Sequence, residues 1–293
     1  VRPTEVGSDG VIATALAAAR GCVQLAGIGF GDLRGVGVGI PGRVDHPTGV
    51  VHTAVNLGLG RLPLGERLGE LIGVEVRVDN DVKATLLGVA HRLDAHDADL
   101  SYVNFGTGVA AATLAGGRLV RGSDNLAGEI GHLPVDPSAG RCVCGQIGCL
   151  EVLAGGRRIA ERLAAAGLTL PGLVEATHAG DQAAIDESLR IGGAIATAVQ
   201  LVVLAHGSAR VALGGGVVRT APGLADLARR QLTERAAGSD FLASLDLPAR
   251  ITLLPGNHPL AAIGAALVGR GAQWHDPSIV CASDPAALGR SDR

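Results

Sequence analysis

The chain has 293 residues, and its 25 lysines and arginines against 28 aspartates and glutamates give a formal net charge of −3 at pH 7. This balance argues against a protein held on nucleic acid or on an acidic membrane by an overall positive charge. Hydrophobic residues make up 47% of the chain, and glycine occurs 45 times. Such a composition excludes intrinsic disorder and predicts one large or two ordinary globular domains.

The sequence contains no methionine and begins with Val1. We expect either that a GTG start codon is written as valine or that the natural start lies upstream. No charged and then apolar export signal opens the sequence. The longest apolar stretch, residues 191–204, is interrupted by two glycines and a glutamine and is shorter than a membrane-spanning helix. We therefore expect a cytoplasmic protein without a membrane partner.

The first hundred residues alternate between helical and strand patterns. Helices are expected over 10–28, 64–72 and about 81–93, and strands over 35–40 and 74–78. The second of these strands runs directly into Asp79, Asn80 and Asp81. Asp81 then lies near the N-terminus of the following helix, where the helix dipole favours a carboxylate. The polar stretch 94–99 predicts that a first α/β domain occupies residues 1–98.

The rest of the chain repeats this alternation. Strands are expected over 100–105, 109–114, 119–121, 210–213 and 251–254, and helices over 151–166, about 182–205, 221–236 and 259–268. This pattern predicts a second α/β domain over residues 99–258. The polar residues 272–293 are expected to form a disordered tail.

Cysteines gather in one short segment of the chain. Cys142, Cys144 and Cys149 lie within eight residues, and His132 precedes them. Clustered thiols in a chain without an export signal favour a metal over disulfides. One imidazole and three thiolates suit a closed tetrahedral zinc site. Because the loop 132–149 has little apolar content, zinc would hold it in shape; the alternative is an exposed, reduced loop with incidental cysteines.

One glycine motif is a false match. Residues 37–42 fit the pattern G-x-G-x-x-G, which in a dinucleotide site opens a helix that receives the pyrophosphate. Residues 43–49 contain Asp45, Pro47 and Gly49 and cannot form that helix. We therefore do not expect a dinucleotide site here.

Two other glycine motifs are candidates for contact with a nucleotide. Gly106, Thr107 and Gly108 lie between two expected strands, where backbone amides and a hydroxyl can approach a phosphate closely. The alternative is an ordinary hairpin turn. Gly214, Gly215 and Gly216 follow an expected strand and precede a helix. They suit close approach of a flat ligand, or form only a flexible connection.

Several of these motifs together resemble the signature of the ROK family, which groups bacterial sugar kinases with sugar-responsive repressors. The resemblance rests on residues 128–132 followed by 142–151, and it covers roughly residues 1–270. Further motifs occur in the family's sequence order: residues 39–42, 56–57, 80–81, 106–108 and 214–216. The resemblance implies an α/β fold, the two-domain actin-like ATPase (ribonuclease H-like) fold, with a cleft between the domains. The last helix, residues 259–270, would return to the smaller domain.

The resemblance also implies roles for single residues. Asp81 would be the catalytic base, accepting the proton of a sugar hydroxyl while that hydroxyl attacks the γ-phosphate of ATP. The residues implied in hexose binding are Gly42, Asn56, Asn80, Asp81, Glu129, His132 and Glu151. A phosphate loop would comprise Gly106, Thr107 and Gly108, and an adenosine segment Gly214, Gly215 and Gly216.

The implied cofactors are structural Zn²⁺ and Mg²⁺ with ATP. Zinc would be held by His132, Cys142, Cys144 and Cys149, with the second ring nitrogen of the histidine directed to the sugar. Judged by the residues alone, three of the implied ligands have plainer alternatives: Asp81 as a helix cap, Glu129 as a surface carboxylate and Glu151 as a first-turn acid.

The sequence also departs from the family pattern. In kinases of the family, a strand and an Asp-x-Gly-Gly-Thr turn precede the segment that resembles residues 2–4. In its repressors, a helix-turn-helix precedes that segment. Neither is present in the given sequence. We expect a truncated small domain whose sheet has an unpaired edge, an ATP site open on one side, and little kinase activity from these residues alone.

Three functions remain open on the sequence. The first is an ATP-dependent hexose kinase similar to glucokinase, with a hexose and ATP as partners and a dimer or tetramer as the expected assembly. The second is a sugar-responsive transcriptional regulator whose DNA-binding part lies outside this chain. The third is a sugar-binding protein without catalysis. Discrimination among hexoses depends on single hydroxyl contacts, which the sequence does not determine.

Overall fold

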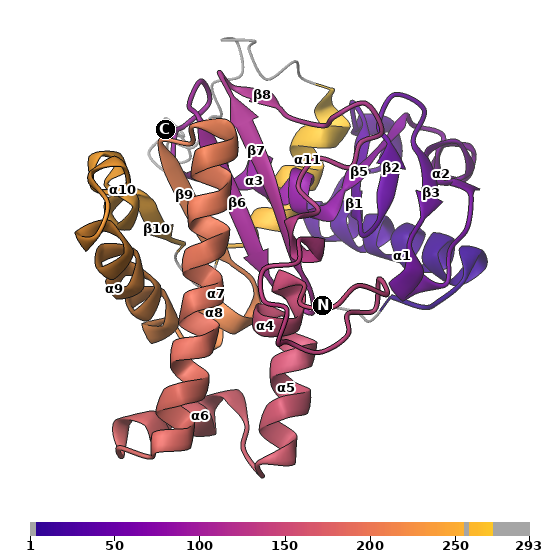
Figure 1. Ribbon diagram of the computed structural model, residues 1–293. Coiled ribbons are helices and arrows are strands. Elements are labelled where there is room, and N and C mark those ends of the chain that lie inside the picture. The colour runs from indigo at the N-terminus through magenta and orange to yellow at the C-terminus, as the bar shows by residue number, and fades with distance from the viewer. Residues whose placement is uncertain (1–3, 255–257, 272–293) are drawn as a thin grey trace, which may run out of the picture.

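The computed structural model describes residues 4–254 and 258–271. The predicted tail, residues 272–293, lies outside this part of the chain. Two α/β units lie side by side, one around a five-stranded sheet and one that contains a two-stranded and a three-stranded sheet (Figure 1). The mixed α/β architecture confirms the predicted fold class.

The five-stranded sheet has the strand order β10-β9-β6-β7-β8. Its strands are β6 (Leu100–Phe105), β7 (Val109–Ala115), β8 (Arg118–Leu119), β9 (Arg210–Gly214) and β10 (Ile251–Leu253). β10, β9 and β6 are parallel, whereas β7 and β8 are antiparallel to their neighbours. The carboxyl ends of β6 and β9 therefore lie at the same edge of the sheet.

Alternating side chains of this sheet enter two different cores. Val103 and Phe105 of β6 pack with the long helix α7 (Gln182–His206). Leu100 and Tyr102 of the same strand join the core formed by two further helices, α3 (Asp81–Arg92) and α11 (Leu260–Arg270). The sheet is thus covered on both faces (Figure 1), as a largely parallel sheet requires.

Helix α7 corrects one expectation from the sequence. The apolar stretch 191–204 is shorter than a bilayer span, but the helix that contains it runs for 25 residues and is long and apolar enough to cross a membrane. More than half of its apolar window is buried inside the protein. Ile191, Ile195 and Val199, for example, are fully buried in the core beneath the sheet.

The smaller unit contains two sheets. The two-stranded sheet pairs β1 (Val36–Ile40) in parallel with β5 (Val76–Asn80). The three-stranded sheet was not predicted, because its strands are short and lie between turns: β2 (Arg43–Asp45), β3 (Val50–Thr53) and β4 (Leu62–Pro63). Helices α1 (Ser8–Ala26) and α2 (Leu64–Ile72) pack on them. Within residues 4–254 and 258–271, β1 pairs with β5 and with no other strand.

The helix predicted over residues 151–166 is two helices. These are α4 (Leu150–Ala154) and α5 (Gly156–Ala165), separated by Gly155 in an extended conformation. The break lets Gly156 N donate to Gly106 O at 2.8 Å. The remaining elements are η1 (Phe30–Asp32), η2 (Val55–Leu57), η3 (Ile130–His132), α6 (Leu170–His178), α8 (Gly216–Thr220), α9 (Gly223–Ala237), α10 (Asp240–Leu245) and η4 (Leu247–Arg250).

Helices α3 and α11 approach each other closely because glycines stand at their contact. A Cβ on Gly264 of α11 would overlap the backbone carbonyl of Ala84, and one on Gly88 of α3 would overlap that of Leu260. We expect Gly264→Ala to force the helices apart and to lower the free energy of unfolding by about 1–3 kcal/mol. Urea unfolding measures this, with Gly223→Ala as the control, since no atom lies within 4 Å of that Cβ position. Equal stability of the two variants would contradict the close contact.

Candidate active site and metal centre

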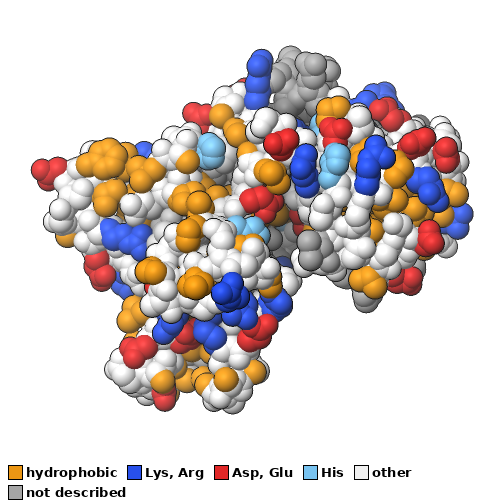
Figure 2. All heavy atoms as spheres, turned by 45° about the vertical axis from the view of Figure 1, so that its right-hand side comes forward, with side chains coloured by type: hydrophobic (Ala, Val, Ile, Leu, Met, Phe, Trp, Pro, Cys, Tyr) orange, Lys and Arg blue, Asp and Glu red, His pale blue; other side chains and the backbone are white. Residues whose placement is uncertain are grey.

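Asp81 and two glycines of the expected adenosine segment line one cavity of about 800 Å³. Asp81 comes from α3, whereas Gly214 and Gly215 stand at the carboxyl end of β9. Tyr102 of β6 and the start of α11 complete the walls. This size is typical of a small-molecule site. The space-filling view shows that the two units meet at a hollow (Figure 2).

The turn after β9 requires glycine for steric reasons. Gly215 has φ +91°, and a Cβ there would overlap the backbone of Phe105 at the end of β6. A Cβ on Gly214 would stand 2.6 Å from the Tyr102 hydroxyl oxygen. Gly216 begins α8 and does not line the cavity. The turn therefore passes directly over the end of β6, at the mouth of the cavity.

The junction of β5 and α3 holds Asp81 in place. Asn80 Oδ1 accepts hydrogen bonds from Val82 N at 3.0 Å and Lys83 N at 3.1 Å, while its Nδ2 donates to Gly42 O at 3.1 Å. The helix cap is therefore Asn80, and the alternative of Asp81 as the cap is wrong. Asp81 is the first residue of α3, and its Oδ1 accepts from Val82 N at 3.0 Å.

The surroundings of Asp81 favour the uptake of a proton. Burial raises the pKa of Asp81 above the ordinary value of 3.8, and the carboxylate of Glu129 raises it further. The Val82 amide and the Lys83 ammonium oppose this shift only in part. Glu129 itself is exposed, immediately before η3. A carboxylate with a raised pKa is a better general base than an ordinary aspartate.

The predicted zinc ligands come together. One ligand atom from each of His132, Cys142, Cys144 and Cys149 lies within 4.8 Å of the others. The distance from His132 Nδ1 to Cys142 Sγ is 3.7 Å, and that from Cys144 Sγ to Cys149 Sγ is 3.6 Å. Tetrahedral zinc with these donors would hold them about 3.5–3.8 Å apart. The donor set therefore fits zinc, with Nδ1 as the histidine ligand and Nε2 left over.

A glutamine supports the thiol cluster from outside. Gln146 Nε2 donates to His132 O at 3.0 Å and to Cys144 Sγ at 3.4 Å. This bonding lowers the pKa of Cys144 to about 6, whereas burial raises that of Cys149 to about 12. Gln146 thus joins the two ends of the loop and stabilises one thiolate.

Glu151 contacts the expected phosphate loop. Its Oε2 accepts from Val109 N at 3.1 Å, and its carboxylate packs against Gly108, where a Cβ would overlap it. The turn 106–108 is also bonded to α5, because Arg157 N at the start of that helix donates to Thr107 O at 3.1 Å. Glu151 is therefore more than a first-turn acid: it connects the metal loop to the turn between β6 and β7.

Of the expected sugar ligands only Asp81 lines this cavity of about 800 Å³, and the expected phosphate loop, residues 106–108, does not line it either. Two of the other expected sugar ligands belong to the smaller unit. Gly42 has φ +99° and packs against Ala54, and Asn56 is exposed on η2, two residues further on. Neither lines the cavity of Asp81, although Asn80 connects Gly42 to the β5–α3 junction.

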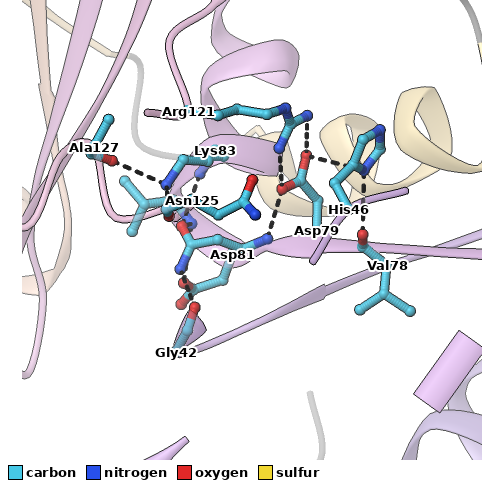
Figure 3. A network of polar contacts seen from close by, with 11 residues as sticks. Gly42, His46, Val78, Asp79, Asp81, Lys83, Arg121, Asn125 and Ala127 are labelled. Carbon is cyan, nitrogen blue, oxygen red and sulfur yellow. Dashed lines mark hydrogen bonds and ion pairs between the residues drawn. The ribbon is translucent and has the colours of Figure 1, made fainter. Parts of the chain in front are cut away.

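Three charged residues beside Asp81 are not among the residues predicted for the site: Asp79, Lys83 and Arg121. Arg121 donates from both terminal nitrogens to the carboxylate of Asp79 at 2.7 Å, and Lys83 donates to the carbonyl oxygens of Ala127 and Asn125 (Figure 3). The predicted strand ended before Asp79, whereas β5 continues through it to Asn80. A sequence signal was available: Asp79 and Lys83 stand among apolar residues. Charged side chains that are buried are normally paired, so such residues indicate a partner elsewhere in the chain.

Comparison with known proteins places these features in a family. The sequence model of the ROK family matches residues 15–267. A glucokinase of Halalkalibacterium halodurans is 39% identical over 47% of this chain and 42% of its own length. A xylose repressor of Caldicellulosiruptor bescii is 33% identical over 43% of this chain and 32% of its own length. The chain thus spans less than half the length of these curated relatives.

A solved structure matches over a longer stretch. The ROK family glucokinase of Streptomyces griseus, in complex with glucose and AMPPNP, superposes with a TM-score of 0.72 at 25% identity. The match covers 92% of this chain and 90% of that one. Nearly the whole chain therefore shares the fold of this kinase.

Proposed function

The chain belongs to the ROK family, and we propose that it carries the site of an ATP-dependent hexose kinase similar to a glucokinase. One observation carries the proposal: Asp81, a carboxylate with a raised pKa, shares a cavity with the glycine turn after β9. Glucokinases among the relatives, one of them in complex with glucose and AMPPNP, support it. A hexose and MgATP are the proposed substrates.

In the proposed reaction a sugar hydroxyl oxygen attacks the γ-phosphorus of ATP. The hydroxyl gives its proton to the Asp81 carboxylate, the new phosphorus–oxygen bond forms, and the bond to the β–γ bridging oxygen breaks, releasing ADP. We assign the phosphates to the turn of Gly106, Thr107 and Gly108, and the adenosine to the turn after β9.

We assign the hexose to the side of Asp81 that carries Glu129 and His132. The other proposed ligands are Gly42, Asn56, Asn80 and Glu151. Bound zinc would be structural, fixing the loop that begins at His132. Because Nδ1 faces the thiols, His132 would offer Nε2 to a sugar hydroxyl.

The pH dependence of turnover tests the pairing of the two carboxylates. Because Glu129 raises the pKa of Asp81, Glu129→Gln should lower that pKa. The base is then deprotonated at lower pH, so the acid limb of the kcat profile should move to lower pH. The profile is measured at saturating hexose with coupled ADP detection, and Glu161→Gln, on the exposed surface of α5, is the control. An unmoved acid limb would contradict the interaction.

The proposal itself is tested by binding and turnover together. D-glucose, N-acetyl-D-mannosamine and D-xylose are titrated calorimetrically with and without AMPPNP, and ADP formation is measured with MgATP. We expect hexose binding by this chain, and hexose-dependent ADP formation by this chain or by one extended upstream. The similarity to a xylose repressor favours a second candidate, the sugar-binding part of a regulator. Sugar binding without ADP formation, in this chain and in one extended upstream, would support the regulator and overturn the kinase.

A further inference from the structure

Two buried charges on either side of Asp81 hold the loop that leads to Glu129. This loop, residues 121–129, connects β8 to η3. At its start Arg121 Nη1 and Nη2 each lie 2.7 Å from an oxygen of Asp79, two residues before Asp81. Near its end the carbonyl oxygens of Ala127 and Asn125 lie 2.9 Å and 3.2 Å from Lys83 Nζ, two residues after Asp81 (Figure 3).

Both anchoring side chains are almost wholly buried. Asp79 is 1% exposed and Lys83 2% exposed, and the buried residues next to Lys83 on α3, Val82 and Ala84, are apolar. An apolar residue would fill this position without the cost of desolvating an ammonium group. The Lys83 ammonium group instead donates hydrogen bonds to two carbonyl oxygens of the 121–129 loop. Buried polar groups with full sets of partners specify one geometry, which apolar packing does not.

At its end this loop is also bonded to β7, because Ala111 N donates to Gly128 O at 2.8 Å. The residues before Gly128 have few other contacts. Leu126, the large apolar residue of the loop, is 48% exposed, and Gly122, Ser123 and Asp124 are exposed as well. Asp124 makes an ion pair with Arg43 at 3.5 Å, but both side chains are largely in solvent, where such pairs contribute little. Asp79 and Lys83 therefore hold the loop from Arg121 to Ala127, and the bond to β7 holds Gly128.

The anchors also connect the two units of the fold. Asp79 and Lys83 belong to the β5–α3 junction, whereas the loop follows β8, at the edge of the five-stranded sheet. Glu129, at the end of the loop, is close enough to Asp81 to act on it electrostatically. A shift of the loop would therefore change the relation between Glu129 and Asp81.

We propose that Asp79, Arg121 and Lys83 are positioning residues, which hold the 121–129 loop so that Glu129 and Asp81 face the hexose in a fixed relation. This inference rests on the proposed function, because it assigns a hexose to that side of Asp81. None of the three residues is assigned a contact with the substrate. They act through the backbone of the loop and through the β5–α3 junction.

Two variants of the full chain test the anchors. Lys83→Met keeps the length of the side chain but leaves two carbonyl oxygens unpaired, and Arg121→Lys keeps a cation but loses the two-pronged pair with Asp79. Arg250→Met is the matched control, because Arg250 also donates to two carbonyl oxygens, those of Leu245 and Ser208, far from Asp81 in the fold. Thermal unfolding identifies which variants are folded.

The first measurement is amide hydrogen exchange in the protein without ligand. We expect exchange in residues 121–129 to be at least tenfold faster in Lys83→Met and in Arg121→Lys than in the parent, and unchanged in Arg250→Met. The second is calorimetric titration with D-glucose, where we expect at least tenfold weaker binding, while AMPPNP affinity stays within twofold. A general loss of structure would weaken both ligands and raise exchange throughout the chain.

The possible results separate this inference from the proposed function. Unchanged exchange of the loop in either folded variant would overturn the anchoring. Faster exchange with unchanged glucose affinity would overturn the positioning role. If the parent chain binds no D-glucose, the proposed function fails for that sugar, and the exchange data alone then support or overturn the anchoring. If Lys83→Met does not fold, Arg121→Lys decides the question.

Discussion

Asp81→Asn should lower kcat for hexose phosphorylation by about 10²–10⁴-fold, the range in which a positioned general base contributes. Asparagine keeps the size and the hydrogen-bonding oxygen of the side chain but cannot take up a proton at the attacking hydroxyl. Because the lost function acts mainly in the transition state, the KM values for hexose and ATP should change much less than kcat.

The same substitution should leave the fold intact. The folded-state pKa of Asp81 is raised mainly by burial, so the charged carboxylate disfavours the folded state at neutral pH. Neutral asparagine removes this penalty, and the unfolding midpoint at pH 7 should stay the same or rise.

A matched control for Asp81→Asn lies in another helix. Asp240 is the first residue of α10, and the helix is capped by Ser239 just as α3 is capped by Asn80. Asp240→Asn should leave turnover unchanged. Full turnover of Asp81→Asn would remove Asp81 from its proposed role. A low midpoint together with low turnover would instead show that the loss comes from unfolding.

Loss of the zinc site should have the second large effect. Cys149 is fully buried, and the loop 132–149 has only a small apolar cluster of its own, which contains Cys142 and Cys149. Without the metal, the loop that begins at His132 is no longer held in place, and neither His132 nor the nearby Glu129 keeps a fixed position. We expect Cys149→Ser to weaken hexose binding by about tenfold or more, because the loop that positions His132 loses the metal that holds it.

The zinc prediction has two independent measurements. Elemental analysis of the purified chain should find about one zinc per chain, and Cys149→Ser should retain much less. Cys22→Ser is the control, because Cys22 is exposed on α1 and takes no part in the cluster. If the parent chain contains no zinc and Cys149→Ser binds the hexose as the parent does, the metal has no part in the site.

The main elements of the fold could be read from local patterns. Leu100–Phe105 was predicted with its observed bounds, and α2, α3 and α7 lie within a few residues of expectation. The misses have local causes as well. Residues 43–63 form strands too short to show alternation, and Gly155 breaks a helix because the following amides bond the turn at Gly106. The sequence of residues 151–166 does not indicate that its amides bond the carbonyl oxygens of Gly106 and Thr107.

The metal ligands and the candidate base were readable for a different reason. Three cysteines close together in the sequence indicate a metal site whatever the fold is. Asn80 and Asp81 were identified because they resemble a family motif. Their partners were not readable. Asn80 caps its own helix, whereas its bond to Gly42 spans 38 residues and depends on the pairing of β1 with β5.

By itself, the sequence therefore determined the order of the longer helices and strands and the cluster of possible zinc donors, because periodicity and ligand chemistry are local properties. It indicated Asp81 as the candidate base through its resemblance to a family motif. Only the tertiary structure decided that Glu151 bonds the start of β7, and that Arg121 and Lys83 anchor a loop beside Asp81. Such contacts join residues about forty positions apart. They follow from strand register and from the need to pair buried charges, which appear only once the chain is packed.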